Sequence, residues 1–177
     1  MKPTAGSTGD EVLAVALQKL ALPRDGILAD IGCGSGKVSI AAAPLVREVW
    51  AVDRRPEAIA YARDQAGIAG AGNITFLEGE APGALEGRPA PDRAFIGGSR
   101  NISAVIAALV AAGTQRVVVS CVRIETLGET VATMRRLGIL RESLLIQVAR
   151  SRDLAGGTMF SPSNPVYLVV GGGDPCS

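Results

Sequence analysis

Leu28-Ala29-Asp30-Ile31-Gly32-Cys33-Gly34-Ser35-Gly36 is the stretch that decides the fold, together with Trp50-Ala51-Val52-Asp53 further along the chain. Each apolar run ends in an acidic residue, and the first continues into a glycine loop. Glycine lets the backbone approach a ligand closely, and a following helix has free N–H donors at its start. An acid about 20 residues beyond such a loop is placed to accept hydrogen bonds from ribose hydroxyls. The stretch therefore predicts a buried strand, a ligand-binding loop and a nucleoside site.

Two ligands suit this pattern, a dinucleotide and S-adenosylmethionine. The dinucleotide loop has the spacing G-x-G-x-x-G, whereas here the loop is G-x-G-x-G and Lys37 follows Gly36 directly. Asp30 precedes the loop, where its charge would repel a pyrophosphate but attract the ammonium and sulfonium groups of S-adenosylmethionine. A tight turn without a ligand is the plain structural alternative. With Asp30 and Asp53 in register, the residues favour S-adenosylmethionine.

Composition excludes several classes of protein. The 177 residues, 47% of them hydrophobic, predict a single domain (residues 1–177) with a flexible N-terminus (1–7) and a tail (171–177). A net charge of +1 and only 3% aromatic residues argue against a nucleic-acid partner. The chain has no histidine, and its three cysteines lie far apart, so no catalytic triad and no metal site are expected. We expect a cytoplasmic protein, because no signal peptide or membrane span is visible and unpaired cysteines suit a reducing compartment.

Strand and helix patterns alternate along the chain. Expected strands cover residues 27–31, 47–53, 73–77, 91–96, 115–122, 142–149 and 166–170. A first helix is expected after a capping box formed by Thr8 and Glu11. Four further helices are expected over residues 35–46, 56–66, 102–111 (capped by Asn101) and 125–137. This alternation predicts an α/β, Rossmann-like, mostly parallel sheet of seven strands. A polar loop with glycine and proline separates the last two strands, which are expected to pair antiparallel, as in the class I methyltransferases that use S-adenosylmethionine.

Further motifs span the chain from Thr8 to Val170. In chain order they read T-x-x-E-V, D-I-G-x-G-x-G, acid-R-x-P-E-A, E-G-[DE]-A-P, P-D-x-x-F-I-G-G-S and G-T-M with N-P-V. On these motifs the chain resembles the decarboxylating precorrin C15-methyltransferases of cobalamin (vitamin B12) biosynthesis, which act on cobalt-precorrin-6B. The same module resembles the C-terminal part of precorrin-6Y C5,15-methyltransferase.

The resemblance implies a transferase that uses S-adenosyl-L-methionine to methylate a precorrin at C15 and removes the C12 acetate carboxyl as CO2. It also implies a tetrapyrrole substrate and a homotetramer assembled through the late hairpin, with no membrane partner. The sequence does not decide whether the substrate contains cobalt, or whether the full-length protein is fused to a C5-methyltransferase domain. From the residues alone, a methyltransferase for another small acidic molecule and a binding-only S-adenosylmethionine domain also stay open.

The expected site has a cofactor shell and a substrate mouth. The shell comprises Thr8, Asp30, Gly32, Cys33, Gly34, Ser35, Gly36, Asp53, Arg54, Glu80 and Ala81. The mouth comprises Gly97, Gly98, Ser99, Arg100, Ser120, Arg123 and Arg150, where arginine would pair with substrate carboxylates. The family usually has asparagine, a small polar residue and glycine where this chain has Ser120, Arg123 and Arg100. No catalytic acid or base is assigned, because the reaction depends mainly on placing the carbon near the methyl group.

Each assignment has a plain structural alternative. Thr8 would serve only as a helix cap, and Glu80 and each arginine only as solvated surface charges. Gly98 would serve only to permit a turn with positive φ. Cys33 is expected to be a small filler of the loop, because nothing near it in the sequence would activate a thiol.

Overall fold

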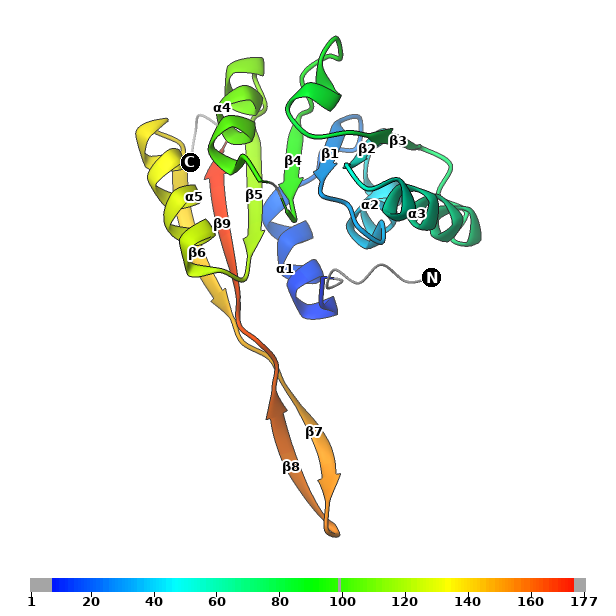
Figure 1. Ribbon diagram of the computed structural model, residues 1–177, viewed down its shortest axis with the longest axis vertical. Helices are drawn as coiled ribbons and strands as arrows, with labels where there is room; N and C mark the ends of the chain where they lie inside the picture. The colour runs from blue at the N-terminus through cyan, green and yellow to red at the C-terminus, as the bar shows by residue number, and fades with distance from the viewer. Residues whose placement is uncertain (1–7, 99, 174–177) are drawn as a thin grey trace.

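Seven strands form the central sheet, in the order β3-β2-β1-β4-β5-β9-β6 (Figure 1). The computed structural model describes residues 8–98 and 100–173. The strands of this sheet are β1 (Ile27–Ile31), β2 (Glu48–Asp53), β3 (Ile74–Glu78), β4 (Arg93–Ile96), β5 (Arg116–Cys121), β6 (Leu140–Ile146) and β9 (Val166–Gly172). β1 to β5 pair in parallel, and β9 runs antiparallel to both β5 and β6. This arrangement confirms the predicted sheet, although β9 continues into the predicted tail.

Helices cover both faces of the sheet. They are α1 (Asp10–Leu20), α2 (Lys37–Ala42), α3 (Pro56–Ile68), α4 (Ile102–Ala112) and α5 (Ile124–Arg136), with short 3-10 turns η1 (Ala43–Leu45) and η2 (Gly83–Leu85). Leu28 of β1 packs in a cluster with α1 and α2, whereas its neighbours Ala29 and Ile31 pack with α4 and α5. Burial on both faces explains why the strand reads as one continuous apolar run. Among these described helices, none has the length and apolar character needed to cross a membrane.

Two arginines hold the C-terminal end of α1 against the sheet. Arg93 is 7% exposed and donates to the carbonyl of Leu20 (3.0 Å) and to Gln115 Oε1 (2.6 Å). Arg116 donates to the carbonyl of Lys19 (3.1 Å). The last carbonyls of a helix have no partner within the helix, so these bonds satisfy them and fix α1 on the sheet.

The predicted capping of two helices is wrong in its side-chain contacts. Gly9, not Thr8, is the N-cap of α1, and it makes no side-chain cap bond. Glu11 instead accepts two hydrogen bonds from Arg150 Nη2, at 2.6 and 2.8 Å. Charge-assisted bonds to a guanidinium are stronger than a bond to a neutral amide, which explains this choice of partner. Asn101 is the N-cap of α4 as predicted, but its side chain makes no cap bond.

The segment between β6 and β9 forms a two-stranded arm, which corrects the predicted polar loop. β7 (Ala149–Leu154) and β8 (Gly157–Pro162) pair antiparallel, and the arm points away from the sheet (Figure 1). Ala155 and Gly156 connect them with φ values of +48° and +80°, as in a type I′ turn. The usual Asn-Gly signal is absent here, and neither face of the arm is buried, so no alternating apolar pattern revealed the strands.

Candidate functional site

A cavity of about 370 Å³ lies where the parallel strands end. Its walls come from the loop after β1, the end of β2 and the turns after β3 and β4. The lining residues are Thr8, Asp30, Ile31, Gly32, Cys33, Gly34, Ser35, Lys37, Val38, Val52, Asp53, Arg54, Arg55, Gly79, Glu80, Ala81, Phe95, Gly97, Gly98 and Arg100. Open α/β sheets bind their ligands at this edge, and the volume falls within the range of small-molecule sites.

Nearly all residues of the expected cofactor shell and some residues of the expected substrate mouth line this cavity. Every shell residue except Gly36 lines it, as do Gly97, Gly98 and Arg100. Gly36 has a φ of +76°, and an added Cβ there would lie 2.9 Å from the Cβ of Ala62 in α3. Gly36 therefore permits the close packing of the loop on α3.

Three other expected mouth residues, Ser120, Arg123 and Arg150, lie outside this wall. Ser120 is in β5, paired with β9. The Arg123 side chain is 72% exposed and forms an ion pair with Glu125 at 3.3 Å. Arg150 is held by α1, as described above. Ser99 falls outside the described residues. A role for these residues in binding substrate stays a prediction.

The glycine loop and the turn after β4 lie backbone against backbone. Gly32 has a φ of +74°, and an added Cβ there would meet the carbonyl oxygen of Gly98 and lie 2.8 Å from its nitrogen. The amides of Gly32 and Cys33 donate to the carbonyl of Val52, at 2.8 and 3.0 Å. Only glycine tolerates both this conformation and this approach, so the glycine pattern reflects a real steric requirement.

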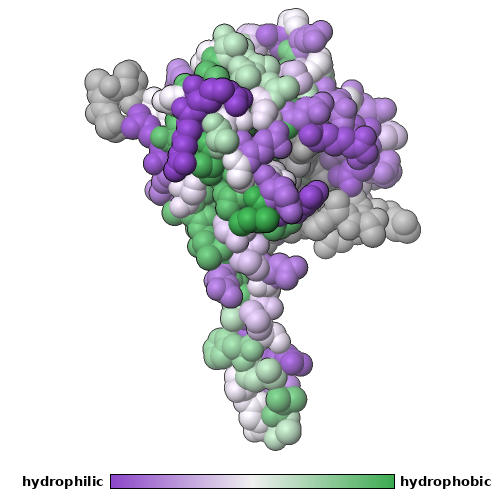
Figure 2. Space-filling view, turned by 60° about the vertical axis from the view of Figure 1, so that its left-hand side comes forward, coloured by the Kyte–Doolittle hydropathy of each residue, from purple (hydrophilic) through white to green (hydrophobic). Residues whose placement is uncertain are grey.

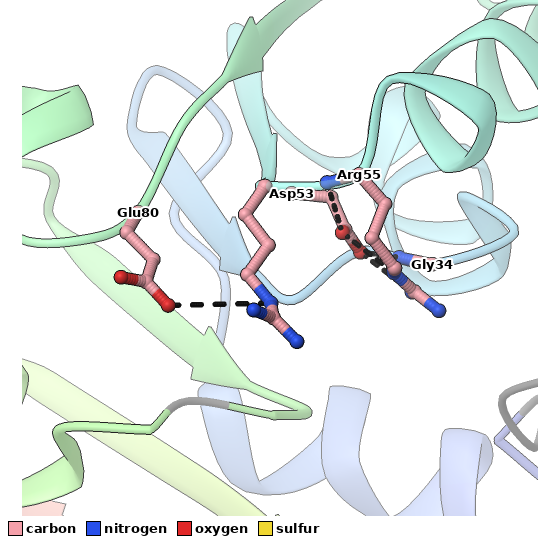
Figure 3. Close-up of polar contacts among 5 residues, drawn as sticks. Gly34, Asp53, Arg55 and Glu80 are labelled. Atoms are coloured by element: carbon pink, nitrogen blue, oxygen red, sulfur yellow. Dashed lines mark hydrogen bonds and ion pairs between the residues drawn. The ribbon is translucent and has the colours of Figure 1, made fainter.

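Asp53 lies at the end of β2, with its side chain 4% exposed. Its Oδ2 accepts bonds from the Gly34 amide (3.0 Å) and Arg55 Nη2 (2.9 Å). Its Oδ1 accepts bonds from the amide and the Nε of Arg55, both at 3.0 Å. Figure 3 shows the carboxylate between these two residues. Burial favours the neutral acid, but the bonds from Arg55 and Gly34 outweigh it and hold the pKa of Asp53 below its ordinary value.

Asp30 lies deeper and has fewer donors. It is 1% exposed and accepts a hydrogen bond from the Ser39 hydroxyl. Burial raises its pKa to about 6, because the bonds from Ser39 compensate only in part and the charge of Asp53 adds to the rise. A cationic ligand group beside Asp30 would favour the ionised carboxylate, so the position suits an ammonium or a sulfonium.

The described cysteines are not suited to nucleophilic chemistry. Cys33 packs with Ala51 and Ile59, and burial, together with the charges of Asp30 and Asp53, raises its pKa well above the ordinary value. Burial also raises the pKa of Cys121 to about 11. Since the thiolate is the reactive form, the contacts of Cys33 agree with a filling role.

Two cations of the cavity wall were not predicted from the sequence. Lys37 Nζ donates to the carbonyl of Thr8 (2.8 Å) and forms an ion pair with Asp10 (2.7 Å). These contacts hold the start of α1 against the start of α2. Arg55 lies on Asp53 as described. Each residue is within two positions of a predicted one, Gly36 or Asp53, and that adjacency was the available signal.

A family profile described as a precorrin methyltransferase domain matches residues 6–170. The chain belongs to the precorrin methyltransferase family. A probable cobalt-precorrin-6B C(15)-methyltransferase (decarboxylating) from Methanosarcina acetivorans is 43% identical over 173 residues, which cover 95% of this chain and 94% of that protein.

Two solved structures show the same family relationship. Precorrin-6y C5,15-methyltransferase from Geobacter metallireducens has a TM-score of 0.90 and 33% identity, covering 98% of this chain and 94% of that one. The precorrin 8w decarboxylase of Methanobacterium thermoautotrophicum has a TM-score of 0.91 and 32% identity, covering 97% and 96%. These matches confirm the predicted family and the class I methyltransferase fold.

Proposed function

We propose that this member of the precorrin methyltransferase family transfers a methyl group from S-adenosyl-L-methionine to C15 of a precorrin. In the same reaction it removes the C12 acetate carboxyl as CO2, as a step of cobalamin biosynthesis. One observation carries the proposal: the family match spans residues 6–170, and within that span the glycine loop and Asp53 line a single cavity at the ligand-binding edge of the sheet.

The residues of the cavity fit S-adenosyl-L-methionine. The close packing of Gly32 on the backbone of Gly98 fixes the glycine loop in the cavity wall, and the carboxylate of Asp53 has two oxygens that can accept from a ribose diol. Asp30 suits the ammonium group, and the turn at Glu80 and Ala81 suits the adenine edge. When bound, this cofactor supplies an electrophilic methyl group carried on sulfur. The sequence pattern and the geometry of the cavity thus favour the same ligand.

The proposed reaction depends more on how the protein positions the substrate than on proton transfer by its side chains. Breaking the bond to the acetate carboxyl releases CO2 and leaves an electron pair that the conjugated macrocycle delocalises. That pair forms the new carbon–carbon bond at C15 as the methyl–sulfur bond breaks, and the proton lost from C15 balances the proton gained by the former acetate carbon. Loss of CO2, rather than a protein base, thus generates the nucleophile, so the lack of histidine is no obstacle. Gly97 and Gly98 keep the mouth open to a flat ring, and Arg100 at the wall is placed to pair with a substrate carboxylate.

We further propose that the protein is a homotetramer assembled through the arm. Leu154 and Phe160 of the arm are 55% and 66% exposed, and Figure 2 shows apolar surface along the arm. An isolated two-stranded hairpin is marginally stable in water, and exposed apolar patches mark interaction sites. Pairing of arms between subunits would cover this surface.

We place the protein in the cytoplasm. Cys33 and Cys121 are both free thiols, which suits a reducing compartment. Fractionation of cells that express the tagged protein, followed by immunoblotting, checks this assignment, and recovery in the membrane fraction would contradict it.

Calorimetry and absorbance spectroscopy on the purified chain test the proposed ligands. We expect micromolar binding of S-adenosylmethionine, on the order of 8 kcal/mol, and a shift of the tetrapyrrole absorbance bands when precorrin is added. Comparing cobalt-containing and metal-free tetrapyrroles identifies the preferred substrate. Tighter binding of NAD than of S-adenosylmethionine would contradict the cofactor assignment. Cofactor binding without any tetrapyrrole binding would indicate a methyltransferase for another molecule.

A further inference from the structure

The donors around Asp53 are of two kinds. Two are backbone amides, those of Gly34 and Arg55, which are fixed by the glycine loop and the start of α3. The other two are the Nε and Nη2 atoms of the Arg55 guanidinium. A carboxylate offers about four lone-pair positions, and these four donors occupy them all. A ribose diol brings two further O–H donors, so it meets a carboxylate that is already saturated.

We propose that Arg55 is a latch on the cofactor site, whose guanidinium and the ribose diol occupy Asp53 in alternation. The exchange conserves hydrogen bonds, because two side-chain N–H donors leave and two O–H donors arrive while the two amides stay. The inference rests on the proposed use of S-adenosylmethionine. It adds that the cofactor binds by displacing a residue of this chain.

The surroundings of Arg55 permit such a movement. Its side chain is 30% exposed and lies in the cavity wall, so the guanidinium reaches solvent without disturbing the core. The first turn of α3 also carries an acid, Glu57, two positions after Arg55. The pKa of Arg55 is raised chiefly by its bonds to Asp53, with a smaller contribution from the charge of Glu57. A guanidinium displaced from Asp53 thus stays in the field of a second carboxylate.

The contact between Arg55 and Asp53 should lower the apparent affinity for the cofactor. A ligand that binds only when Arg55 has left Asp53 shows an apparent affinity lowered by the fraction of molecules with a free carboxylate. If Arg55 is seated in about nine molecules of ten, removing its guanidinium tightens binding roughly tenfold. A residue that held the cofactor would produce the opposite change, so the sign of the effect separates the two roles.

Calorimetry on the full chain with S-adenosylhomocysteine tests the latch. This probe carries the ribose diol without the sulfonium charge, so charge repulsion between ligand and arginine contributes little. Arg55→Met removes the guanidinium and keeps the aliphatic stem. Arg47→Met is the matched control: it removes the same charge from an exposed arginine that directly precedes β2, at the opposite end of this strand from Asp53 and outside the cavity wall.

We expect Arg55→Met to bind S-adenosylhomocysteine about ten times more tightly than the natural chain, and Arg47→Met to stay within about threefold of it. Unchanged or weaker binding by Arg55→Met, while the natural chain binds, would overturn the latch and leave the cofactor assignment standing. Failure of all three proteins to bind would remove the ribose site itself, and with it both proposals.

A second measurement needs no variant to fold. The ¹⁵Nε–H signal of Arg55 in the natural chain, followed by NMR, reports its bond to Asp53. Saturating S-adenosylhomocysteine should move this signal toward that of a solvated arginine. A signal that keeps its position while the ligand binds would show that Arg55 stays on Asp53, contrary to the proposal.

Discussion

Asp30→Asn should stabilise the fold while weakening the site. Burial raises the pKa of Asp30 from 3.8 to about 6. A raised pKa in the folded state contributes stability that is fully present below the unfolded value of 3.8 and is lost as the pH rises through about 6. This rise in pKa corresponds to about 3 kcal/mol. The ionised carboxylate therefore lowers the free energy of unfolding by about that amount at neutral pH and above.

Asparagine has the same shape, carries no charge and still accepts the bond from Ser39. Its amide N–H groups need partners in the buried site, and this reduces the gain equally at every pH. The free energy of unfolding of Asp30→Asn, relative to the natural chain, should therefore increase by about 2 kcal/mol between pH 4.5 and pH 8. Urea unfolding at both pH values, followed by circular dichroism, measures this difference.

Asp53→Asn is the matched control, with the opposite expected sign. The pKa of Asp53 is lowered in the folded chain, so its ionised form contributes stability above the unfolded value that is lost at acid pH. Asp53→Asn should thus lower stability at pH 8. A stability difference between Asp30→Asn and the natural chain that does not change with pH would refute the reasoning about Asp30.

Three further predictions follow from the site and the arm. Asp53→Ala should weaken S-adenosylmethionine binding at least fivefold (about 1 kcal/mol), because the ribose loses a charged acceptor; unchanged affinity by calorimetry would exclude Asp53 from the site. Gly98→Ala should keep the melting temperature and the cofactor affinity, since no described atom outside the neighbouring residues lies within 4 Å of the added Cβ, but the methyl group at the mouth should reduce turnover about tenfold. Gly32→Ala, whose Cβ would collide with Gly98, should lower the melting temperature, the affinity and the turnover. A double change, Leu154→Asp with Phe160→Asp, should convert the proposed tetramer to a monomer in light scattering, and a natural chain that is already monomeric would contradict the proposed role of the arm.

The core of the fold could be predicted because its signals are local. β1 (Ile27–Ile31) has the predicted bounds, since a continuous apolar run ends at the glycine loop. The helix expected over residues 35–46 is shorter in the structure. α2 ends at Ala42 and a 3-10 turn containing Pro44 follows, because proline has no N–H to continue the α-helical bonding. The glycine loop and the acid at the end of β2, both singled out from the sequence, line one cavity.

The contacts that could not be predicted join distant or flexible parts of the chain. Glu11 and Arg150 are 139 positions apart, and no spacing rule connects a first helical turn to the base of an arm. The seating of Arg55 on Asp53 depends on which way a long side chain folds, and sequence spacing does not report that. Of the expected arginines, Arg100 reaches the cavity wall, whereas Arg123 and Arg150 are held by nearby carboxylates.

Turnover of a precorrin tests the central claim most directly. The purified chain is incubated with S-adenosylmethionine and either cobalt-containing or metal-free precorrin substrate. S-adenosylhomocysteine, CO2 and the mass of the tetrapyrrole are then measured together. Equal amounts of S-adenosylhomocysteine and CO2 are expected, with a product that has gained one methyl group and lost one carboxyl group. Binding of both ligands without formation of S-adenosylhomocysteine, or methylation without release of CO2, would contradict the proposed reaction.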